Sequence, residues 1–298
     1  MDLIFVFGIG ILRILQSSFN KQSSKHLPSF NKYLRFGLFF EASAAVFALL
    51  YLCIVGFDGI NAFTLICSAA MGFCFLLELT TSMKALQNAP LSLCTMCALG
   101  GGIIIPAVSG IFFFEEGMSI LAWLGVVLFF ISAYFLMPSE KKTESVKAST
   151  VFILFCNFTI NGLCGIISKF FAVKLENGNA AAFACLSYAF AAALFGAVLL
   201  TAQAKLPKSP SHGTDRGFLP KPVYLYGGIV GAVCATIVFS TTVLSRTVSI
   251  IVLNTIPNAV CLVGSLALDV LLFKGKLSVM KITGVALNVI ATTVIVLF

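Results

Sequence analysis

The chain has 298 residues, of which 59% are apolar and only 10% are charged. A soluble domain carries about 25% charged residues, and a mean hydropathy of +1.06 is too high for a surface that faces water. The composition therefore excludes a soluble enzyme and predicts an all-α polytopic membrane protein. The net charge of +8 does not indicate nucleic acid, because the basic residues are scattered through short connections instead of lining one face.

Apolar windows, separated by charged residues, glycine and proline, predict about ten transmembrane helices. A span needs about 20 apolar residues, and a barrel strand is not expected because these runs are continuous and longer than about ten residues. The predicted ranges are 3–22, 36–55, 61–83, 91–114, 119–137, 150–171, 180–202, 223–244, 249–273 and 279–298. The first is the least regular, because it is interrupted by Arg13, Gln16, Asn20 and Lys21.

The two halves of the chain resemble each other. Residues 15–21 align with 163–169, and residues 114–119 align with 273–278. A repeat of five spans must insert upside down relative to its partner, because five is odd. Inverted repeats are typical of secondary transporters, whose binding site lies near mid-membrane between the repeats. We therefore expect two inverted five-helix repeats around a central cavity, which divide the chain into three parts: 1–137, a polar linker at 138–149, and 150–298.

Part of the first half resembles the ten-span, EamA-type members of the drug/metabolite transporter superfamily. The residues that carry the resemblance are KALQNAPLS at 84–92, Pro106, Gly110, FFFEEGMS at 112–119 and WLG at 123–125. In this family an acid typically ends the fourth span. A short turn follows, and then a fifth span with a glycine near its start.

Two positions depart from the family pattern. In the second half, Lys274-Gly-Lys276 replaces the acid. The first span is also similar to that of small multidrug resistance proteins, but Arg13 stands in the region where those proteins carry a glutamate. The resemblance implies a secondary transporter whose first span lines the central cavity, with efflux as the commoner direction.

Lysine and arginine are distributed unevenly between the predicted connections. The odd-numbered connections hold fifteen of them, whereas the even-numbered ones hold only Lys169, Lys174 and Arg246. Cytoplasmic loops carry an excess of these residues. We therefore expect a multi-pass protein of the cytoplasmic membrane with both termini outside the cell.

Arg13 is the most informative candidate for a binding residue. It lies about 15 Å along the first helix at 1.5 Å per residue, near mid-membrane, where a charge costs several kcal/mol and indicates function. Its guanidinium offers five donors suited to carboxylate or phosphate. Gln16 and Asn20 follow on much the same face. The alternatives are that Arg13 pairs with an acid to join helices, or snorkels to the surface.

Glu41 and Glu78 are the candidates for ion coupling or for a counter-ion to Arg13. Each is expected within a few residues of the cytoplasmic end of its span. Burial disfavours the charged form of a carboxylate, so either residue could exchange protons during transport. Glu115 and Glu116 are expected in a solvated turn, and Asp269 is expected to pair locally with nearby lysines.

The second half contributes asparagines in place of charges. Asn161 aligns with Arg13 in the repeat, and Asn254 and Asn258 flank Pro257, which frees backbone carbonyls that a cavity can use. We predict that Asn161, Asn254 and Asn258 bind substrate. The alternative is hydrogen bonding between helices.

Nothing in the sequence indicates catalysis, so no enzyme activity, cofactor or metal is expected. Both histidines, His26 and His212, fall in predicted loops, and no phosphate-binding GxxxxGK[ST] loop is present. Cys94 and Cys97 form a CxxC motif within an apolar run. Because no second cysteine pair accompanies it, we do not expect it to bind a metal.

The hypothesis is a secondary transporter that moves a small polar metabolite, anionic or zwitterionic, by alternating access. It would be driven by protons or by the substrate gradient, and would act as a monomer or homodimer in the lipid bilayer. A lipid-linked carrier flippase and a non-transporting scaffold are the alternatives.

Overall fold

The computed structural model describes most of the chain. The described ranges are 2–24, 26–27, 29–57, 59–88, 91–113, 117, 119–136, 148–175, 178–204, 219–273 and 279–297. Glu115, Glu116 and most of the predicted linker lie outside these ranges, and only the backbone of Asp269 is described. The predictions made for these residues therefore stay predictions.

The regular structure of the described residues is entirely helical, as the continuous apolar runs predict. The ten helices are α1 (Asp2–Ser24), α2 (Phe30–Val55), α3 (Ala62–Asn88), α4 (Leu91–Phe113), α5 (Ile120–Leu136), α6 (Ala148–Lys174), α7 (Ala180–Ala204), α8 (Lys221–Leu244), α9 (Ile250–Phe273) and α10 (Val279–Leu297). Each predicted range corresponds to one of them, and α1 is continuous despite its polar residues.

Two helices extend by more than one turn beyond the ends that the apolar windows predict. α2 begins at Phe30, and α3 continues to Asn88. The Ser29 side chain accepts a hydrogen bond from the backbone N–H of Lys32 (3.4 Å), which caps the first turn of α2. The added turns carry charged residues, which an apolar window excludes although lysine and arginine are good helix formers.

The longer helices change the depth of two acidic residues. Glu41 lies about three turns after the start of α2, and Glu78 about three turns before the end of α3. The expectation that both lie within a few residues of a helix end is therefore wrong. Each sits near the middle of its helix, because the capped and charged turns lengthen the helix on that side.

Six of the described helices are long and apolar enough to cross a membrane. They are α1, α2, α6, α7, α8 and the Ala62–Ala85 part of α3. Shorter apolar segments occur in α4, α5, α9 and α10. Large apolar side chains also cover the outer surface: Ile54 and Ile120 are 81% and 82% exposed. Apolar surface on this scale needs lipid around it, so the chain has the character of an integral membrane protein.

Helices of the first half pack mainly against helices of the second half. α2 packs along α7, α5 along α10 and α4 along α9. α1 packs against α8 and α9, whereas α6 packs against α3 and α4; likewise α2 packs on α8 and α7 on α3. If each helix of the first half is replaced by its counterpart five helices later, and the reverse, the same helix pairs result. The packing between the two halves is therefore symmetric.

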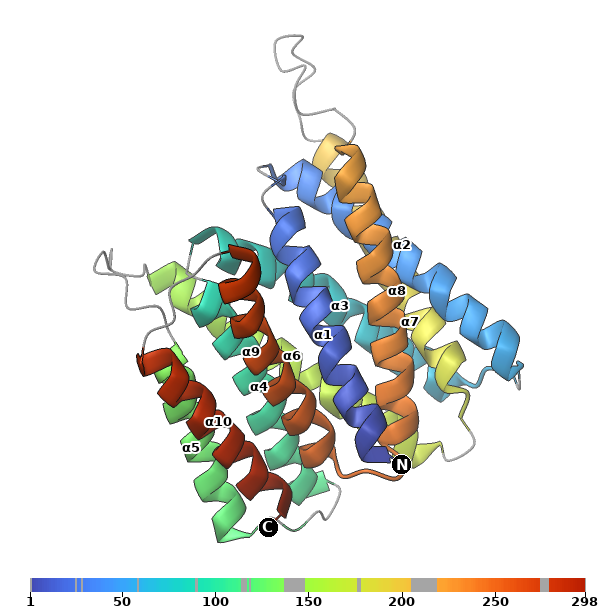
Figure 1. Cartoon of the computed structure of the whole chain (residues 1–298). Coiled ribbons are helices and arrows are strands. Elements are labelled where there is room, and N and C mark those ends of the chain that lie inside the picture. Colours follow the sequence, from blue (N-terminus) through green and yellow to red (C-terminus); the bar gives the residue numbers. More distant parts are fainter. Residues whose placement is uncertain are drawn as a thin grey trace.

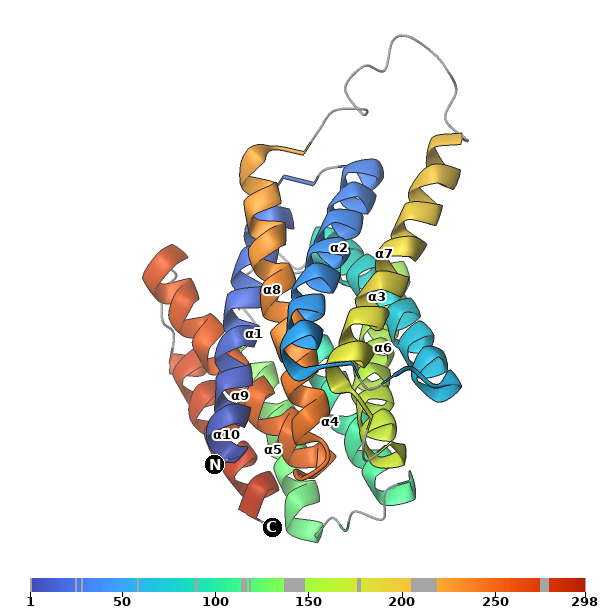
Figure 2. The ribbon, with the colours of Figure 1, turned by 90° about the vertical axis from the view of Figure 1, so that its right-hand side faces the viewer.

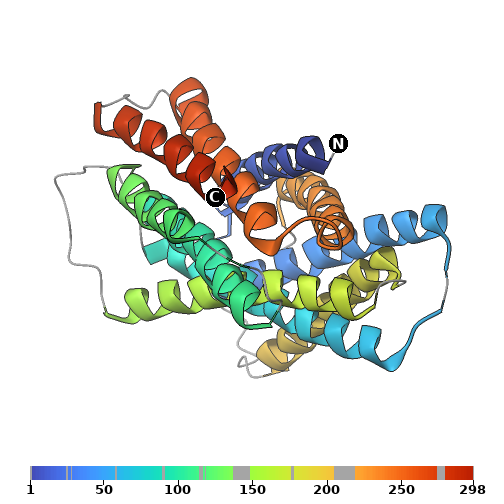
Figure 3. The ribbon, with the colours of Figure 1, turned by 90° about the horizontal axis from the view of Figure 1, so that it is seen from below.

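The helices run broadly side by side, and the start of α1 and the end of α10 lie at the same end of the bundle (Figures 1 and 2). Seen from that end, α5 and α10 lie next to each other at one edge of the molecule (Figure 3). The other helices form the larger part of the bundle, which holds the candidate site.

Glycines allow the closest approach between helices of the two halves. A Cβ on Gly101 of α4 would collide with the backbone carbonyl of Phe158 in α6, and one on Gly162 would lie 2.8 Å from the carbonyl oxygen of Gly101. A Cβ on Gly231 of α8 would lie 2.9 Å from the backbone nitrogen of Ala44 in α2. Small residues at such crossings are the usual device for packing helices in lipid.

Hydrogen bonds join the α8–α9 connection to neighbouring helices at the end of the bundle that holds both termini. Lys169, which the sequence analysis grouped with connecting residues, is instead buried within α6 and donates to the carbonyl oxygen of Val248 (3.2 Å). The hydroxyl of Thr247 donates to a carboxylate oxygen of Asp2 (3.1 Å). The α8–α9 connection is thereby held against both α6 and the start of α1.

Replacing Gly101 by alanine tests the α4–α6 crossing. We expect Gly101→Ala to lower thermal stability strongly, because its Cβ meets rigid backbone, and overpacking costs about 1–3 kcal/mol even where neighbours can yield. Gly228→Ala is the matched control, since a Cβ there meets no atom within 4 Å. Melting of the detergent-solubilised protein would measure both. Equal melting temperatures for the two variants would show that the crossing is looser than described.

Candidate functional site

A cavity lies in the middle of the bundle and is lined by eight of the ten helices. The solvent-accessible volume of the cavity is about 160 Å³. Its lining residues are Arg13, Gln16, Asn20, Phe40, Glu41, Met71, Phe75, Glu78, Leu79, Ser82, Gly102, Asn161, Cys164, Gly165, Ser168, Tyr188, Cys234, Ile237, Val238, Thr241 and Asn254. α5 and α10 contribute none of these residues, in keeping with their place at the edge of the bundle.

The structure brings seven of the eight predicted site residues to this cavity. They are Arg13, Gln16, Asn20, Glu41, Glu78, Asn161 and Asn254. The eighth, Asn258, lies behind the wall and bonds to Arg13. Residues distant in the sequence therefore meet in one place, although the role of each in binding stays a prediction.

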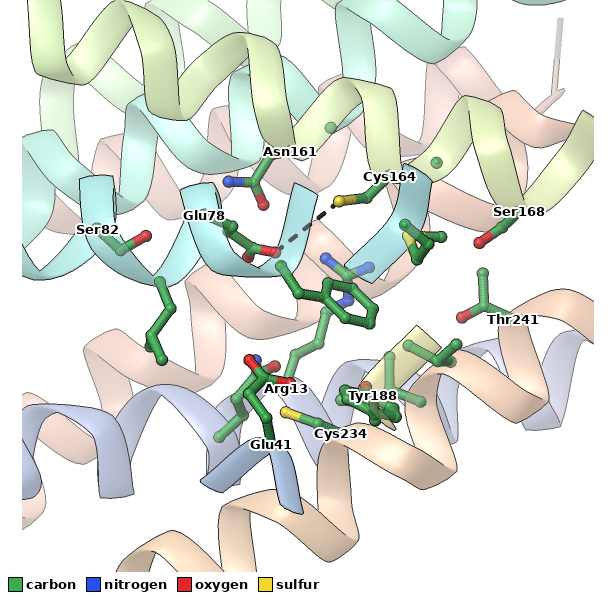
Figure 4. A pocket seen from close by; sticks show the side chains of 18 of the residues that line it. Arg13, Glu41, Glu78, Ser82, Asn161, Cys164, Ser168, Tyr188, Cys234 and Thr241 are labelled. Carbon is green, nitrogen blue, oxygen red and sulfur yellow. Dashed lines mark hydrogen bonds between the residues drawn. The ribbon is translucent and has the colours of Figure 1, made fainter. Parts of the chain in front are cut away.

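Arg13 extends from α1 into the cavity (Figure 4). Its Nη1 donates to Oδ1 of Asn258 in α9 (2.8 Å), whereas its buried Nε has no partner. No carboxylate oxygen of Glu41 or Glu78 lies within 4.0 Å of a guanidinium nitrogen, so the ion pair considered above is not formed. The guanidinium stays inside the bundle and keeps donors available to a solute.

Asn258 fixes the position of the guanidinium by contacting two other helices. The residue is fully buried, and its Nδ2 donates to the carbonyl oxygen of Leu99 in α4 (3.4 Å). Gly102 leaves room for this amide, because a Cβ there would lie 3.2 Å from Nδ2. A neutral amide thus holds the cation and joins α1, α4 and α9.

Glu41 projects from α2 into the cavity wall (Figure 4). Its side chain is only 1% exposed, and its Oε2 is buried without a hydrogen-bond partner. A carboxylate in this setting needs a donor, because an unpaired buried charge is costly. A solute cation or a bound proton would meet that need.

Glu78 lies with Asn161 and Cys164 on the other side of the cavity in the same view (Figure 4). The Cys164 thiol approaches Oε2 of Glu78 at 4.0 Å. Arg13 projects between this group and Glu41, so the cavity presents one cation between two acids. If all three are ionised, the net charge of its lining is negative.

The asparagines of α6 anchor the wall next to Glu78. Asn157 donates to the hydroxyls of Ser82 (2.6 Å) and Thr81 (3.1 Å) in α3. Asn161 in turn donates to the backbone carbonyl of Asn157 (3.0 Å), and its side chain borders the cavity. Asn157 therefore joins α6 to α3, whereas Asn161 and Asn254 reach the cavity.

Part of the cavity lining is apolar and aromatic. The rings of Phe75 in α3 and Tyr188 in α7 stack with centroids 4.8 Å apart, and both border the cavity. Phe40, Met71 and Val238 add to the same kind of surface. The site can therefore hold a solute with an apolar part as well as charged groups.

Sequence reasoning missed several lining residues whose helical spacing could have revealed them. On α6, Cys164, Gly165 and Ser168 follow Asn161 at intervals of three, four and seven, which places them on one face. On α8, Cys234 and Thr241 show the same spacing. Starting from one polar residue in the middle of an apolar helix, steps of three, four and seven residues predict the other residues on the same helix face.

The described residues contain no cluster suited to a metal ion. No group of three or more histidine, cysteine, aspartate or glutamate side chains comes together among them. The arrangement of Arg13 between two acids suits the binding of a charged solute through hydrogen bonds.

Comparison with known proteins places the fold but not the activity. No protein-family model matches the chain, and no curated protein matches it. Among solved structures, 28 chains match. One of them, a chain in a crystal structure, has a TM-score of 0.73 and 16% identity, with 98% of each chain covered. A likeness at this identity shows a shared fold alone.

A double-mutant cycle tests the bond between Arg13 and Asn258. We expect Asn258→Ala to destabilise the protein, and to destabilise it less in the background of Arg13→Gln, because the charged partner is gone. The coupling should be about 1.5–3 kcal/mol, the range for hydrogen bonds to charged groups. Unfolding of the four proteins in detergent would measure it. Strictly additive effects would show that the two side chains do not interact.

Proposed function

We propose that the protein is a secondary transporter that moves a small polar metabolite across the cytoplasmic membrane by alternating access. The observation that carries the proposal is the cavity, because helices of both halves enclose it and it gathers Arg13, Glu41 and Glu78. Ionisable residues inside a membrane bundle are expensive and mark solute or proton pathways. A cavity between two halves is also where transporters bind their substrates.

Ten spans in two inverted repeats are part of the proposal. The packing between helices supports it, since the same set of pairs results when each helix is exchanged with the one five positions away. The position of the start of α1 and the end of α10 at the same end of the bundle supports an even number of crossings (Figure 1). Two halves of this kind can rock against each other around a fixed site.

The orientation that we propose puts both termini outside the cell. Lys21, Lys32, Arg35, Lys84 and Lys221 all lie in helix turns at the end of the bundle opposite the termini. Under the positive-inside rule, this bias supports a cytoplasmic location for that end. Membership of the EamA-like transporters, which the sequence resembles, remains part of the proposal, as does efflux as the direction.

Glu41 and Glu78 are our candidates for coupling to protons. Both line the cavity at the middle of their helices, so either carboxylate can bind a proton and release it during the transport cycle. Transport along the substrate's own gradient would not need this step.

Transport by protein in liposomes tests the proposal. We expect a mixture of small charged metabolites to yield protein-dependent flux that Arg13→Gln lowers by about tenfold or more, the equivalent of about 1.4 kcal/mol of binding. Arg246→Gln is the matched control, because Arg246 lies in the α8–α9 connection and bonds to the carbonyl of Gly178, away from the cavity. The control should transport like the wild type.

The other outcomes distinguish the alternatives. Flux that Arg13→Gln leaves unchanged would overturn the role of Arg13. Movement of lipid-linked compounds, with no competition from short water-soluble analogues, would favour a flippase. Complete absence of protein-dependent flux would contradict transport and favour a membrane scaffold.

A further inference from the structure

We propose that the cavity selects a zwitterion, with the solute's carboxylate on Arg13, its ammonium group on Glu41, and an apolar side chain against Phe75 and Tyr188. The inference rests on the proposed function and narrows its substrate class. It excludes the simple anions that Arg13, considered alone, would suggest.

Three buried polar atoms on side chains that line the cavity have no partner within the protein, and a solute can supply one to each. Nε of Arg13 is a donor and needs an acceptor, whereas Oε2 of Glu41 and Oδ1 of Asn20 are acceptors and need donors. All three side chains line the same cavity. A carboxylate meets the first need, and an ammonium group, with its three donors, meets the other two.

The arrangement of charges leaves space for a bridging solute. Because no oxygen of Glu41 lies within 4.0 Å of a guanidinium nitrogen of Arg13, the two charges do not satisfy each other. Nη1 of Arg13 donates to the neutral amide of Asn258, which does not neutralise the charge. A zwitterion can place its anionic end on one charge and its cationic end on the other.

The unpartnered donor on Arg13 and the two carboxylates argue against the two simpler classes of solute. An anion would meet two carboxylates, Glu41 and Glu78, and like charges repel strongly in a site that is largely shielded from water. A cation without a carboxylate would leave Nε of Arg13 buried and unpartnered and would face its positive charge. A zwitterion avoids both penalties and leaves the net charge of the cavity unchanged.

The apolar wall defines the rest of the solute. Phe75 and Tyr188 present a stacked pair of rings to the cavity, and Met71, Ile237 and Val238 continue the apolar lining. A hydrocarbon or aromatic side chain would be removed from water there, which is worth about 25 cal/mol per Å² of buried apolar surface. The chemistry therefore fits a neutral α-amino acid with an apolar side chain.

Binding of three related probes to four proteins tests the proposal. The probes are L-leucine, L-leucinamide, which lacks the carboxylate, and N-acetyl-L-leucine, which lacks the ammonium group. The proteins are the wild type, Arg13→Gln, Glu41→Gln and the control Arg246→Gln, each measured by calorimetry in detergent. Each variant is assessed by the ratio of its affinities for two probes. A general loss of stability lowers both affinities and therefore does not change this ratio.

We expect the wild type and the control to bind L-leucine at least about tenfold more tightly than either truncated probe, since a charge-assisted contact is worth about 1.4 kcal/mol or more. Arg13→Gln should abolish the preference for L-leucine over L-leucinamide and keep the preference over N-acetyl-L-leucine. Glu41→Gln should do the reverse.

Three results would overturn the inference. They are binding of N-acetyl-L-leucine as tight as that of L-leucine, preference ratios that the two variants leave unchanged, and no binding of any probe. If other small solutes still show protein-dependent flux that requires Arg13, the zwitterion fails while the proposed function stands. If no solute is moved at all, the proposed function fails with it.

Discussion

The hydrogen bond between Arg13 and Asn258 is the interaction on which the candidate site depends. A guanidinium near the middle of a membrane is expensive, and a direct ion pair with an acid would lower its cost but would also consume its binding capacity. Here a neutral amide holds the cation, and the two nearby carboxylates stay more than 4.0 Å away. The cavity therefore keeps an unpartnered donor on Arg13 and an unpartnered acceptor on Glu41, the two groups to which the proposed solute would bind.

The packing of the bundle explains how these groups meet. Helices of one half pack mainly on helices of the other, so side chains far apart in sequence converge on a shared space. Gly101 and Gly162 let α4 and α6 approach closely, and Gly102 makes room for the amide of Asn258. Removal of these small residues would displace the groups that hold Arg13. The site is thus a consequence of close packing as much as of the charges that line it.

Hydropathy alone was enough to predict the ten helices, because a continuous apolar run of this length has few other structures available. It missed the first turns of α2, since Ser29 caps them while Lys32 and Arg35 interrupt the apolar window. Polar residue type within an apolar run was enough to select seven of the residues that line the cavity, although the predicted depth of Glu41 and Glu78 was wrong. Which atoms bond was beyond the sequence: the partner of Arg13 proved to be Asn258, because the rotation of each helix depends on packing in three dimensions.

Modification of Cys164 in native membranes tests the central claim, that the charged cavity is open to water and occupied by solute during transport. Cys164 borders the cavity beside Glu78, whereas Cys261 is buried outside its lining. A small, charged, thiol-specific reagent with site-resolved mass spectrometry would compare the two. The account predicts that Cys164 reacts much faster than Cys261 and that saturating transported solute slows its reaction. Equal, slow reaction at both cysteines, unaffected by solute, would contradict it.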